Sequence, residues 1–309
     1  MRRIIIILGP TASGKSRLAV EVALAMGGEV VNADSQQVYR GMEVGTSKPT
    51  AAEMRGVPHH LYSIVEPDED FDAAAYATRA DQTVADITSR KNVPIICGGT
   101  GLYIRALTRG LAEMPRVPVE VREKVWVEIE RHGAPRAHAR LTAVDPAAAE
   151  RITPADRQRI QRALEVFDAT GVPISEFQKA HRFARPRYDC LKIGLRIPRT
   201  ELHRRIDARA RRMFAAGLVD EVRGLLANGY SPELRSFKAI GYRQAVDVVR
   251  GLLSVSEAAA LTARDSRRYA KRQETWFRAD PEVRWVEGDE RGVREALELV
   301  RTFGVGCGS

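Results

Sequence analysis

The chain has 309 residues, of which 44% are hydrophobic and 29% charged, as is typical of a globular protein with room for two domains. No apolar run approaches ~18 residues, so we expect no membrane span. Only two arginines precede the first apolar stretch, which leaves no room for a signal peptide. The three cysteines, Cys97, Cys190 and Cys307, lie too far apart for a disulfide framework or a metal-ligand motif. We therefore expect a cytoplasmic protein.

The net charge of +9 is unevenly distributed along the chain. Residues 1–112 hold 12 basic and 12 acidic residues, so the whole excess follows Leu111. A basic excess confined to one part of a chain favours a polyanionic partner, with nucleic acid as the first candidate. An Arg-rich composition inherited from a GC-rich genome is the alternative.

The N-terminal stretch predicts a phosphate-binding loop. Ile4 to Leu8 are apolar and β-branched, as in a buried strand, and helical spacing resumes at Leu18. The loop amides and the helix N-terminus would bind phosphate, while Lys15 would reach a terminal phosphate and the Ser16 hydroxyl could coordinate Mg²⁺. The alternative is a glycine turn with an incidental lysine. The predicted diphosphate-binding residues are Gly9, Pro10, Thr11, Ala12, Ser13, Gly14, Lys15 and Ser16.

A second strand, residues 29–33, ends at Asp34, and a third, residues 93–97, ends at a glycine-rich turn that contains Thr100. Ligands of α/β proteins bind where such strands end. Asp34 could act as a base or hold Mg²⁺ through water, or it could be a turn acid. The third strand lacks the aspartate of an NTPase Walker B strand. Between these strands we expect a loop over 36–49, a short strand within 58–70 and a helix over 71–90, and we discount His59 and His60 as metal ligands.

The sequence changes character from about Glu113. We expect helices over 119–132, 134–142 and 153–170, the last capped by Thr153. Gln158 and Arg162 lie opposite the apolar stripe of that helix; such a face is usually only solvated, but it could also contact nucleic acid. Residues 177–188 show little secondary-structure signal.

Residues 190–197 again read as a strand, which suggests that the chain returns to the first sheet. Helices are expected over 199–216, 218–228, 239–251 and 256–279, and a capping box of Ser254 and Glu257 opens the last. The predicted fold is therefore an α/β P-loop core with a parallel sheet flanked by helices, formed by residues 1–112 and 189–309. Residues 113–188 would form a small all-helical insertion.

Six stretches together resemble the bacterial tRNA dimethylallyltransferases, also called tRNA isopentenyltransferases. They are GPTASGKS at 9–16, ADSQQVYRGMEVGTSKP at 33–49, GGTGLY at 98–103, ITPADRQRIQRALEV at 152–166, FKAIGYRQ at 237–244 and YAKRQETWF at 269–277. The resemblance implies Mg²⁺-dependent transfer of a dimethylallyl group from its diphosphate to the exocyclic amine of the adenosine 3′ of the anticodon. It implies the tRNA anticodon stem-loop and dimethylallyl diphosphate as partners, and we expect a monomer.

The resemblance also implies roles for individual residues. Asp34 would be the general base, Thr100 would bind the diphosphate near the breaking bond, Lys15 would stabilise the leaving group, and Arg209 would lie close to the reactive centre. Ser16 would be the metal ligand. Contacts with tRNA would come from Asp34, Ser35, Gln36, Gln37, Thr100, Arg122, Gln158, Arg159, Ile160, Gln161 and Arg162.

Three other readings stay open at this stage. A P-loop small-molecule kinase explains residues 1–112 but not the basic remainder of the chain. An adenylate isopentenyltransferase would use free AMP or ATP, whereas the full insertion and the basic excess favour tRNA. An RNA-binding protein with a merely structural P-loop would not need Lys15, Ser16, Asp34 and Thr100.

Overall fold

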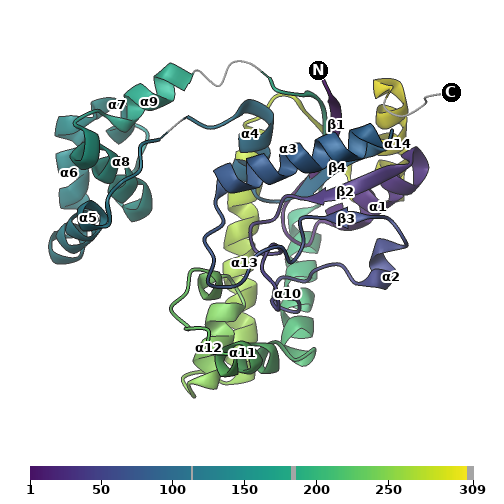
Figure 1. Ribbon diagram of the computed structural model, residues 1–309. Coiled ribbons are helices and arrows are strands. Elements are labelled where there is room, and N and C mark those ends of the chain that lie inside the picture. The colour runs from purple at the N-terminus through teal and green to yellow at the C-terminus, as the bar shows by residue number, and fades with distance from the viewer. Residues whose placement is uncertain (113, 182–185, 305–309) are drawn as a thin grey trace. The chain divides into compact units, whose positions relative to one another are not determined.

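The computed structural model describes residues 1–112, 114–181 and 186–304. The chain divides into two compact units, one formed by Met1–Thr108 with Arg187–Ser309 and the other by Arg109–Pro186 (Figure 1). The sequence predicted the insertion over 113–188, so both of its ends fall slightly earlier in the structure. Within the described ranges, no helix is both long and apolar enough to cross a membrane.

The first unit is built on a six-stranded parallel sheet in the order β3-β2-β4-β1-β5-β6. Its central strands are apolar on both faces, because helices cover both faces of a parallel sheet of this kind. The strands are β1 (Arg3–Leu8), β2 (Gly28–Asn32), β3 (His59–His60), β4 (Val93–Gly98), β5 (Asp189–Arg196) and β6 (Val283–Glu287). β5 pairs with β1, which confirms that the chain returns to the first sheet.

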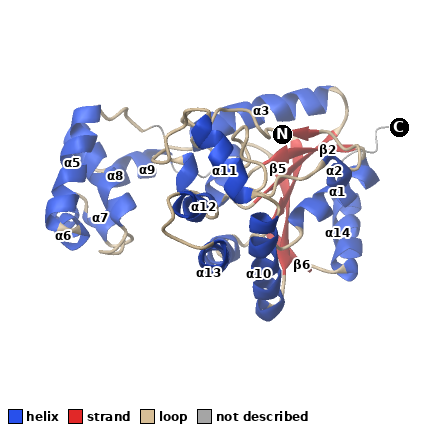
Figure 2. Ribbon diagram, turned by 90° about the horizontal axis from the view of Figure 1, so that it is seen from below, coloured by secondary structure: helices blue, strands red, loops and turns tan. Residues whose placement is uncertain are grey.

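Helices lie on both faces of this sheet. Figure 2 shows α3 (Ala73–Ser89) on one face and α1 (Lys15–Met26) with α14 (Glu290–Phe303) on the other. Asp72 caps α3 by accepting hydrogen bonds from the backbone amides of Ala74 and Ala75. Two further helices, α2 (Ala51–Met54) and α4 (Gly101–Arg109), complete this part of the unit.

Four α-helices pack together beyond the carboxyl end of the sheet. They are α10 (Arg199–Ala215), α11 (Leu218–Ala227), α12 (Tyr242–Val249) and α13 (Val255–Arg278), with a 3-10 turn, η1 (Ser236–Lys238), before α12. α10 packs along α13, and α12 contacts both α11 and α13. The predicted capping box of Ser254 and Glu257 opens α13.

Helices are the regular secondary structure of the second unit in its described residues, and the unit has its own apolar core around Val125, Leu141, Ile160 and Leu164. Asp145 organises its interior by accepting hydrogen bonds from the backbone amides of Ala148 (3.0 Å) and Ser175 (2.9 Å). Its helices are α5 (Val119–His132), α6 (Ala134–Val144), α7 (Pro146–Ala149), α8 (Arg157–Thr170) and α9 (Ile174–His181).

The structure differs from the sequence reading in three details. The helix expected from Thr153 begins at Arg157, because Asp156 caps it and Thr153 lies in the preceding turn. The stretch 177–188 shows little secondary-structure signal in the sequence, yet α9 extends through its first residues. The helix expected over 239–251 begins only at Tyr242, because Gly241 before it has a φ of 99° that a helix cannot contain.

Candidate active site

The ends of three strands assemble the site. Leu8 of β1 lies opposite Gly98 of β4, and Asn32 of β2 lies opposite Cys97 of the same strand. The loops that follow β1, β2 and β4 therefore leave the sheet side by side at its carboxyl edge. This register brings together the P-loop, Asp34 and Thr100, which the sequence predicted separately.

The P-loop leads from β1 into α1. Gly14 has a φ of 92°, a conformation that glycine adopts without steric cost, and it serves as the N-cap of α1. Burial lowers the pKa of the Lys15 ammonium group, while the nearby Asp34 carboxylate opposes this shift. The buried Ser13 hydroxyl has no hydrogen-bond partner in the described part of the chain. A partly desolvated cation at a helix N-terminus is a strong attractor for an anionic ligand.

Asp34 sits in a tight turn that the buried Asn32 builds. The Asn32 side chain accepts a hydrogen bond from the Asp34 backbone amide (2.9 Å) and donates to the carbonyl of Leu61 (3.0 Å). One Asp34 carboxylate oxygen accepts from the Gln36 amide (2.9 Å), so Asp34 is also the turn acid that the sequence allowed. The Asp34 side chain is only partly buried, which leaves its carboxylate open to a ligand.

Thr100 lies in the turn after β4 and connects this turn to the loop after β2. Its hydroxyl accepts a hydrogen bond from the Ser35 amide (3.0 Å), and its own amide donates to the Ala33 carbonyl (3.1 Å). The Tyr269 hydroxyl lies within hydrogen-bonding reach of Thr100, and burial raises the pKa of Tyr269, so this phenol stays protonated. Thr100 is thus held at a fixed place beside Asp34.

Gln273 of α13 fixes the P-loop to the turn after β4. Its side-chain oxygen accepts from the Thr11 amide (2.8 Å), and its side-chain nitrogen donates to the Gly99 carbonyl (2.9 Å). A β-carbon on Gly99 would come within 2.2 Å of that nitrogen, so the turn needs glycine here. One buried amide therefore sets the distance between the P-loop and the turn after β4.

Arg209 reaches the P-loop from α10. Its guanidinium group donates to the Thr11 hydroxyl (2.9 Å), the Ser47 hydroxyl (2.9 Å) and the Thr46 carbonyl (3.1 Å). Burial lowers the pKa of Arg209, and Asp34 opposes this effect at longer range. All three acceptors are neutral, so the positive charge of Arg209 is not cancelled by a carboxylate in direct contact.

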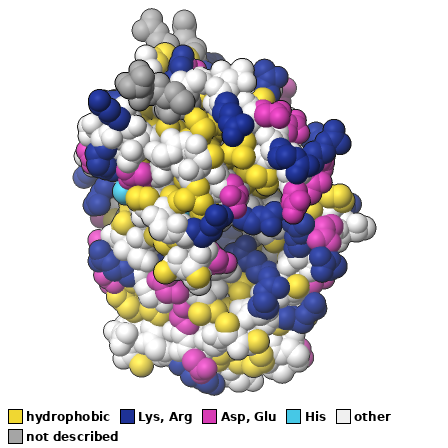
Figure 3. Space-filling view, turned by 90° about the vertical axis from the view of Figure 1, so that its right-hand side faces the viewer, with side chains coloured by type: hydrophobic (Ala, Val, Ile, Leu, Met, Phe, Trp, Pro, Cys, Tyr) yellow, Lys and Arg dark blue, Asp and Glu magenta, His cyan; other side chains and the backbone are white. Residues whose placement is uncertain are grey.

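A cavity of about 830 Å³ opens over the P-loop. Its basic lining residues are Lys15, Arg17, Lys48, Arg204, Arg205, Arg209 and Arg212. Figure 3 shows a face of the molecule on which Lys and Arg side chains gather around a hollow near its centre. The lining also holds two acidic residues, Glu43 and Glu53, so basic residues remain in excess. The size of the cavity and this basic excess fit a ligand with two or more phosphate groups.

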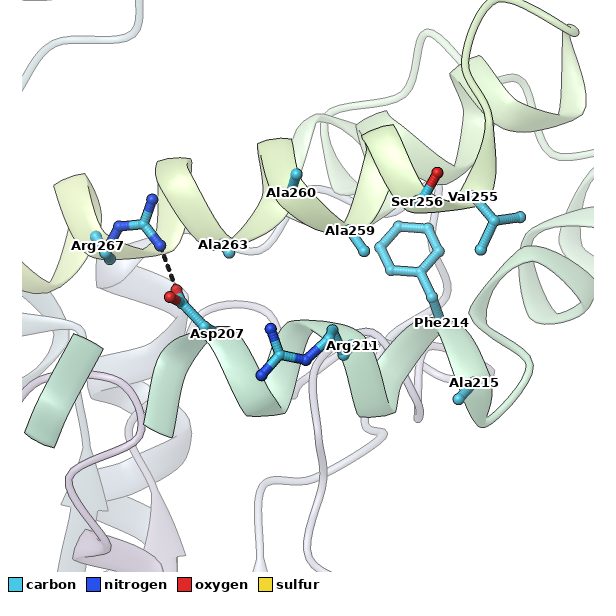
Figure 4. A pocket seen from close by; sticks show the side chains of 10 residues that line it. All are labelled: Asp207, Arg211, Phe214, Ala215, Val255, Ser256, Ala259, Ala260, Ala263 and Arg267. Atoms are coloured by element: carbon cyan, nitrogen blue, oxygen red, sulfur yellow. Dashed lines mark hydrogen bonds and ion pairs between the residues drawn. The ribbon is translucent and has the colours of Figure 1, made fainter. Parts of the chain in front are cut away.

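The opposite side of α10 faces α13 across a second cavity of about 800 Å³ (Figure 4). Here Asp207 forms an ion pair with Arg267, and Phe214 lies against the small residues of α13. This ion pair and the packing of Phe214 fix α10 to α13, so α10 presents Arg209 toward the P-loop from a supported helix.

The residues present fit Mg²⁺ only as an ion shared with a phosphate ligand. Among the described residues, no cluster of three or more His, Cys, Asp or Glu side chains could hold a metal by itself. Ser16 is an exposed residue at the start of α1. Mg²⁺ commonly takes one or two protein ligands and completes its shell with substrate phosphates and water. His59 and His60 serve other roles, because His60 bonds the buried Glu29 (2.6 Å).

The remaining predicted contact residues fall into two groups. Gln37 is in the first unit and donates to the carbonyls of Thr46 (3.1 Å) and Ser47 (3.2 Å), so it supports the loop that holds Arg209. Arg122 and Gln158 are exposed on α5 and α8 of the second unit.

Within the second unit, three of the predicted side chains already have partners, one of them Arg159, which lies 3.5 Å from the Asp156 carboxylate. Gln161 donates to Glu165 (2.8 Å), and Arg162 lies 3.7 Å from the same carboxylate. The Ile160 side chain is 0% exposed in the core of this unit, so the prediction that it contacts tRNA is wrong for the side chain.

Sequence reasoning did not assign roles to Asn32, Gln273, Glu221 or Tyr242. Backbone groups of distant segments are bonded by Asn32, Gln273 and Glu221, whereas Tyr242 bonds the Glu221 side chain. No local pattern signals such contacts. Gln273 and Tyr242 lie in the stretches 269–277 and 237–244, so the family resemblance was the one signal available for them.

The chain is similar to known proteins over most of its length. The IPP transferase family matches residues 37–280. The tRNA dimethylallyltransferase of Geobacter sulfurreducens is 54% identical over 285 residues, which cover 92% of each chain. That of Anaeromyxobacter dehalogenans is 50% identical over 284 residues, which cover 92% of this chain and 94% of the relative.

Solved structures are similar as well. The full-length tRNA isopentenylpyrophosphate transferase of Bacillus halodurans aligns with a TM-score of 0.72 at 36% identity, over 98% of this chain and 96% of that one. A eukaryotic dimethylallyltransferase acting on tRNA aligns with a TM-score of 0.83 at 25% identity, over 98% and 79% of the two chains. The chain belongs to the IPP transferase family.

Proposed function

We propose that this protein transfers a dimethylallyl group from dimethylallyl diphosphate to the exocyclic amine of the adenosine 3′-adjacent to the anticodon in tRNA. The observation that carries the proposal is the convergence of Lys15, Asp34, Thr100 and Arg209 at one edge of the sheet. This arrangement pairs a cationic cradle for a leaving group with a carboxylate beside it. The curated relatives bear the same activity in their names.

The P-loop side would bind the diphosphate. Backbone amides at the start of α1, the Lys15 ammonium group and the Arg209 guanidinium group would stabilise the negative charge that develops as the allylic C–O bond breaks. Because these groups are held in place before the ligand arrives, they need little reorganisation during the reaction. Mg²⁺, when bound at Ser16 and the phosphates, would add further charge stabilisation.

Asp34 would act on the second reactant, the adenine amine. The amine nitrogen of adenine forms a bond to the allylic carbon, that carbon loses its bond to the diphosphate oxygen, and the amine proton passes to the Asp34 carboxylate. An exocyclic amine is a poor nucleophile, so a positioned base beside it is physically reasonable. Thr100, fixed between Ser35 and Ala33, would contact the diphosphate close to the breaking bond.

The tRNA would be bound by surfaces of both units. Ser35, Gln36 and Gln37 follow Asp34 directly, whereas Arg122, Gln158, Arg159 and Arg162 would contribute from the second unit. Adenine within a stacked loop cannot reach the partly buried Asp34 carboxylate, so the base must leave the stack to react. The basic excess after Leu111 supports a polyanionic acceptor rather than a free nucleotide.

Acceptor choice tests this proposal. Purified protein with Mg²⁺ and labelled dimethylallyl diphosphate is offered unmodified tRNA or AMP, and ATP turnover is followed in parallel. We expect label in tRNA and none in AMP. Label in AMP alone would instead indicate an adenylate isopentenyltransferase, and ATP turnover without transfer would indicate a kinase.

A further inference from the structure

Arg209 depends on a loop rather than on an ion pair for its position. Two of its three hydrogen bonds go to the end of loop 43–47, at Thr46 and Ser47, and the third goes to Thr11 of the P-loop. Arginine side chains have many accessible rotamers, so an arginine held by neutral acceptors is placed only as well as those acceptors are. What fixes loop 43–47 therefore fixes Arg209.

Glu221 of α11 holds loop 43–47 in place through hydrogen bonds to the loop backbone. One carboxylate oxygen of Glu221 accepts from the backbone amides of Glu43 (2.9 Å) and Val44 (2.8 Å). The other accepts from the Gly45 amide (3.3 Å). Three successive backbone N–H groups thus converge on one carboxylate, and hydrogen bonds to a charged acceptor are about twice as strong as neutral ones.

Tyr242 fixes Glu221 in turn. Its hydroxyl donates to Glu221 at 2.5 Å, and its ring is 0% exposed. Burial and the adjacent carboxylate raise the pKa of Tyr242, so the phenol remains a donor. Loop 43–47 packs directly on this ring, because a β-carbon on Gly45 would come within 2.4 Å of it.

The negative charge of Glu221 holds the loop, whereas the positive charge of Arg209 would bind the ligand, so the two charges act at different places. A carboxylate in direct contact with Arg209 would compete with a diphosphate for the guanidinium group. Glu221 instead acts through the loop backbone and is not among the residues that line the P-loop cavity. The full charge of Arg209 then remains available to an anion.

We propose that Glu221, supported by Tyr242, is a positioning residue that presets loop 43–47 and thereby holds Arg209 against the P-loop for diphosphate binding. This inference rests on the proposed function, because it assigns a diphosphate to the P-loop cavity. It makes Glu221 neither a catalytic residue nor a ligand of the substrate.

The test combines Glu221→Gln with Arg209→Lys in the full-length protein. Glu221→Gln replaces one acceptor oxygen with an NH₂ group that cannot accept from the loop amides. We expect a roughly 10-fold weaker affinity for inorganic diphosphate with Mg²⁺ by calorimetry, and an equal rise in KM for dimethylallyl diphosphate. The KM for tRNA should stay unchanged.

Non-additivity distinguishes positioning from general loosening of the fold. If Glu221 acts through Arg209, the double variant should bind diphosphate no more weakly than Arg209→Lys alone. Asp220→Asn is the matched control, because Asp220 neighbours Glu221 on α11 but its side chain is 76% exposed. Tyr242→Phe keeps the carboxylate and should weaken binding in the same direction by about 2–3-fold.

Two results would overturn the inference. One is an unchanged diphosphate affinity in both Glu221→Gln and Tyr242→Phe, and the other is an additive loss in the double variant. Either could occur while the wild-type protein transfers label to tRNA, and the proposed function would then stand. A wild-type protein that binds no diphosphate would contradict both the proposed function and this inference.

Discussion

At the scale of single residues, the half-buried Arg209 and the buried Glu29 have opposite surroundings. Arg209 is surrounded by neutral acceptors and keeps its charge for a ligand. Glu29, at the start of β2, is satisfied within the protein by Arg90 (2.8 Å), Asn92 (2.7 Å) and His60 (2.6 Å). A charge that is paired with opposite charges within the protein contributes to stability. A charge without such a partner indicates a functional site.

Glu29 therefore predicts a pH dependence of stability. Burial opposes ionisation, but the hydrogen bonds from Arg90, Asn92 and His60 prevail and lower the pKa of Glu29 to about 2. Since this folded-state pKa lies below the unfolded value of about 4.3, the stabilisation is present at neutral pH and is lost as pH falls toward 2. It amounts to about 3 kcal/mol.

The measurement compares urea unfolding of wild type and Glu29→Gln between pH 7 and pH 3. The variant should be less stable at pH 7, and the gap should narrow as pH falls. Glu295→Gln, at an exposed position of α14, is the control and should track the wild type. A gap that stays constant with pH would show that the pKa of Glu29 does not differ between the folded and unfolded protein.

At the scale of elements, the P-loop is positioned by a helix that comes more than 250 residues later in the chain. α13 contributes Gln273, whose amide joins Thr11 of the P-loop to Gly99 after β4. Glutamate at this position could still accept from Thr11 but could not donate to Gly99. The P-loop and the turn after β4 would then be free to separate.

We therefore expect Gln273→Glu to raise the KM for dimethylallyl diphosphate about 10-fold, because a lost buried hydrogen bond and an unpaired carboxylate act at the same place. Steady-state kinetics and diphosphate calorimetry check this expectation. Thr275→Ala, two residues along the same helix and exposed, serves as the control. Unchanged diphosphate binding in Gln273→Glu would mean that the P-loop holds its shape without α13.

Much of the core could be predicted from the sequence because its signals are local. The run Ile4–Leu8, the capping residues of α13 and the glycines of the P-loop each define structure within a few positions. β6 and α14 were not predicted, although Asp289 and the stripe of Val293, Ala296 and Val300 carry an ordinary helical pattern.

The supports of the site could not be predicted, because they depend on contacts between distant segments. Glu221 lies 176 to 178 residues from the amides that it binds. Nothing in the local sequence distinguishes it from Asp220 beside it, which is exposed. The sequence indicated which loops meet a ligand, and only the fold shows what holds those loops in place.

At the scale of the whole molecule, the basic excess after Leu111 predicts how tRNA binding responds to salt. Binding of phosphates by Lys and Arg releases counterions, so affinity should fall steeply with ionic strength. We expect about 10²–10⁴-fold weaker tRNA binding at 300 mM than at 50 mM salt, measured by fluorescence anisotropy. A flat response would contradict a role for the basic surface.

The same measurement of tRNA binding against salt can determine the contribution of a single charged residue. Arg122→Gln should reduce the slope of log affinity against log salt by about 1, as expected for one lost phosphate contact. Arg294 is exposed on α14, a helix that packs against the sheet of the first unit, and Arg294→Gln should leave the slope unchanged. Equal effects of both variants would show that net charge, rather than a contact at Arg122, sets the slope.

In the proposed function, the cationic groups Lys15 and Arg209 and the Asp34 carboxylate act on two different reactants of one reaction. Asp34→Asn tests this proposal most directly, because asparagine can still accept from the Gln36 amide and so keeps the turn. In single-turnover transfer to tRNA at saturating dimethylallyl diphosphate, we predict a rate 10²–10⁴-fold below wild type, with diphosphate affinity nearly unchanged. An unchanged transfer rate would contradict the assignment of Asp34 as the base, and a large loss of diphosphate binding would contradict the separation of the two roles.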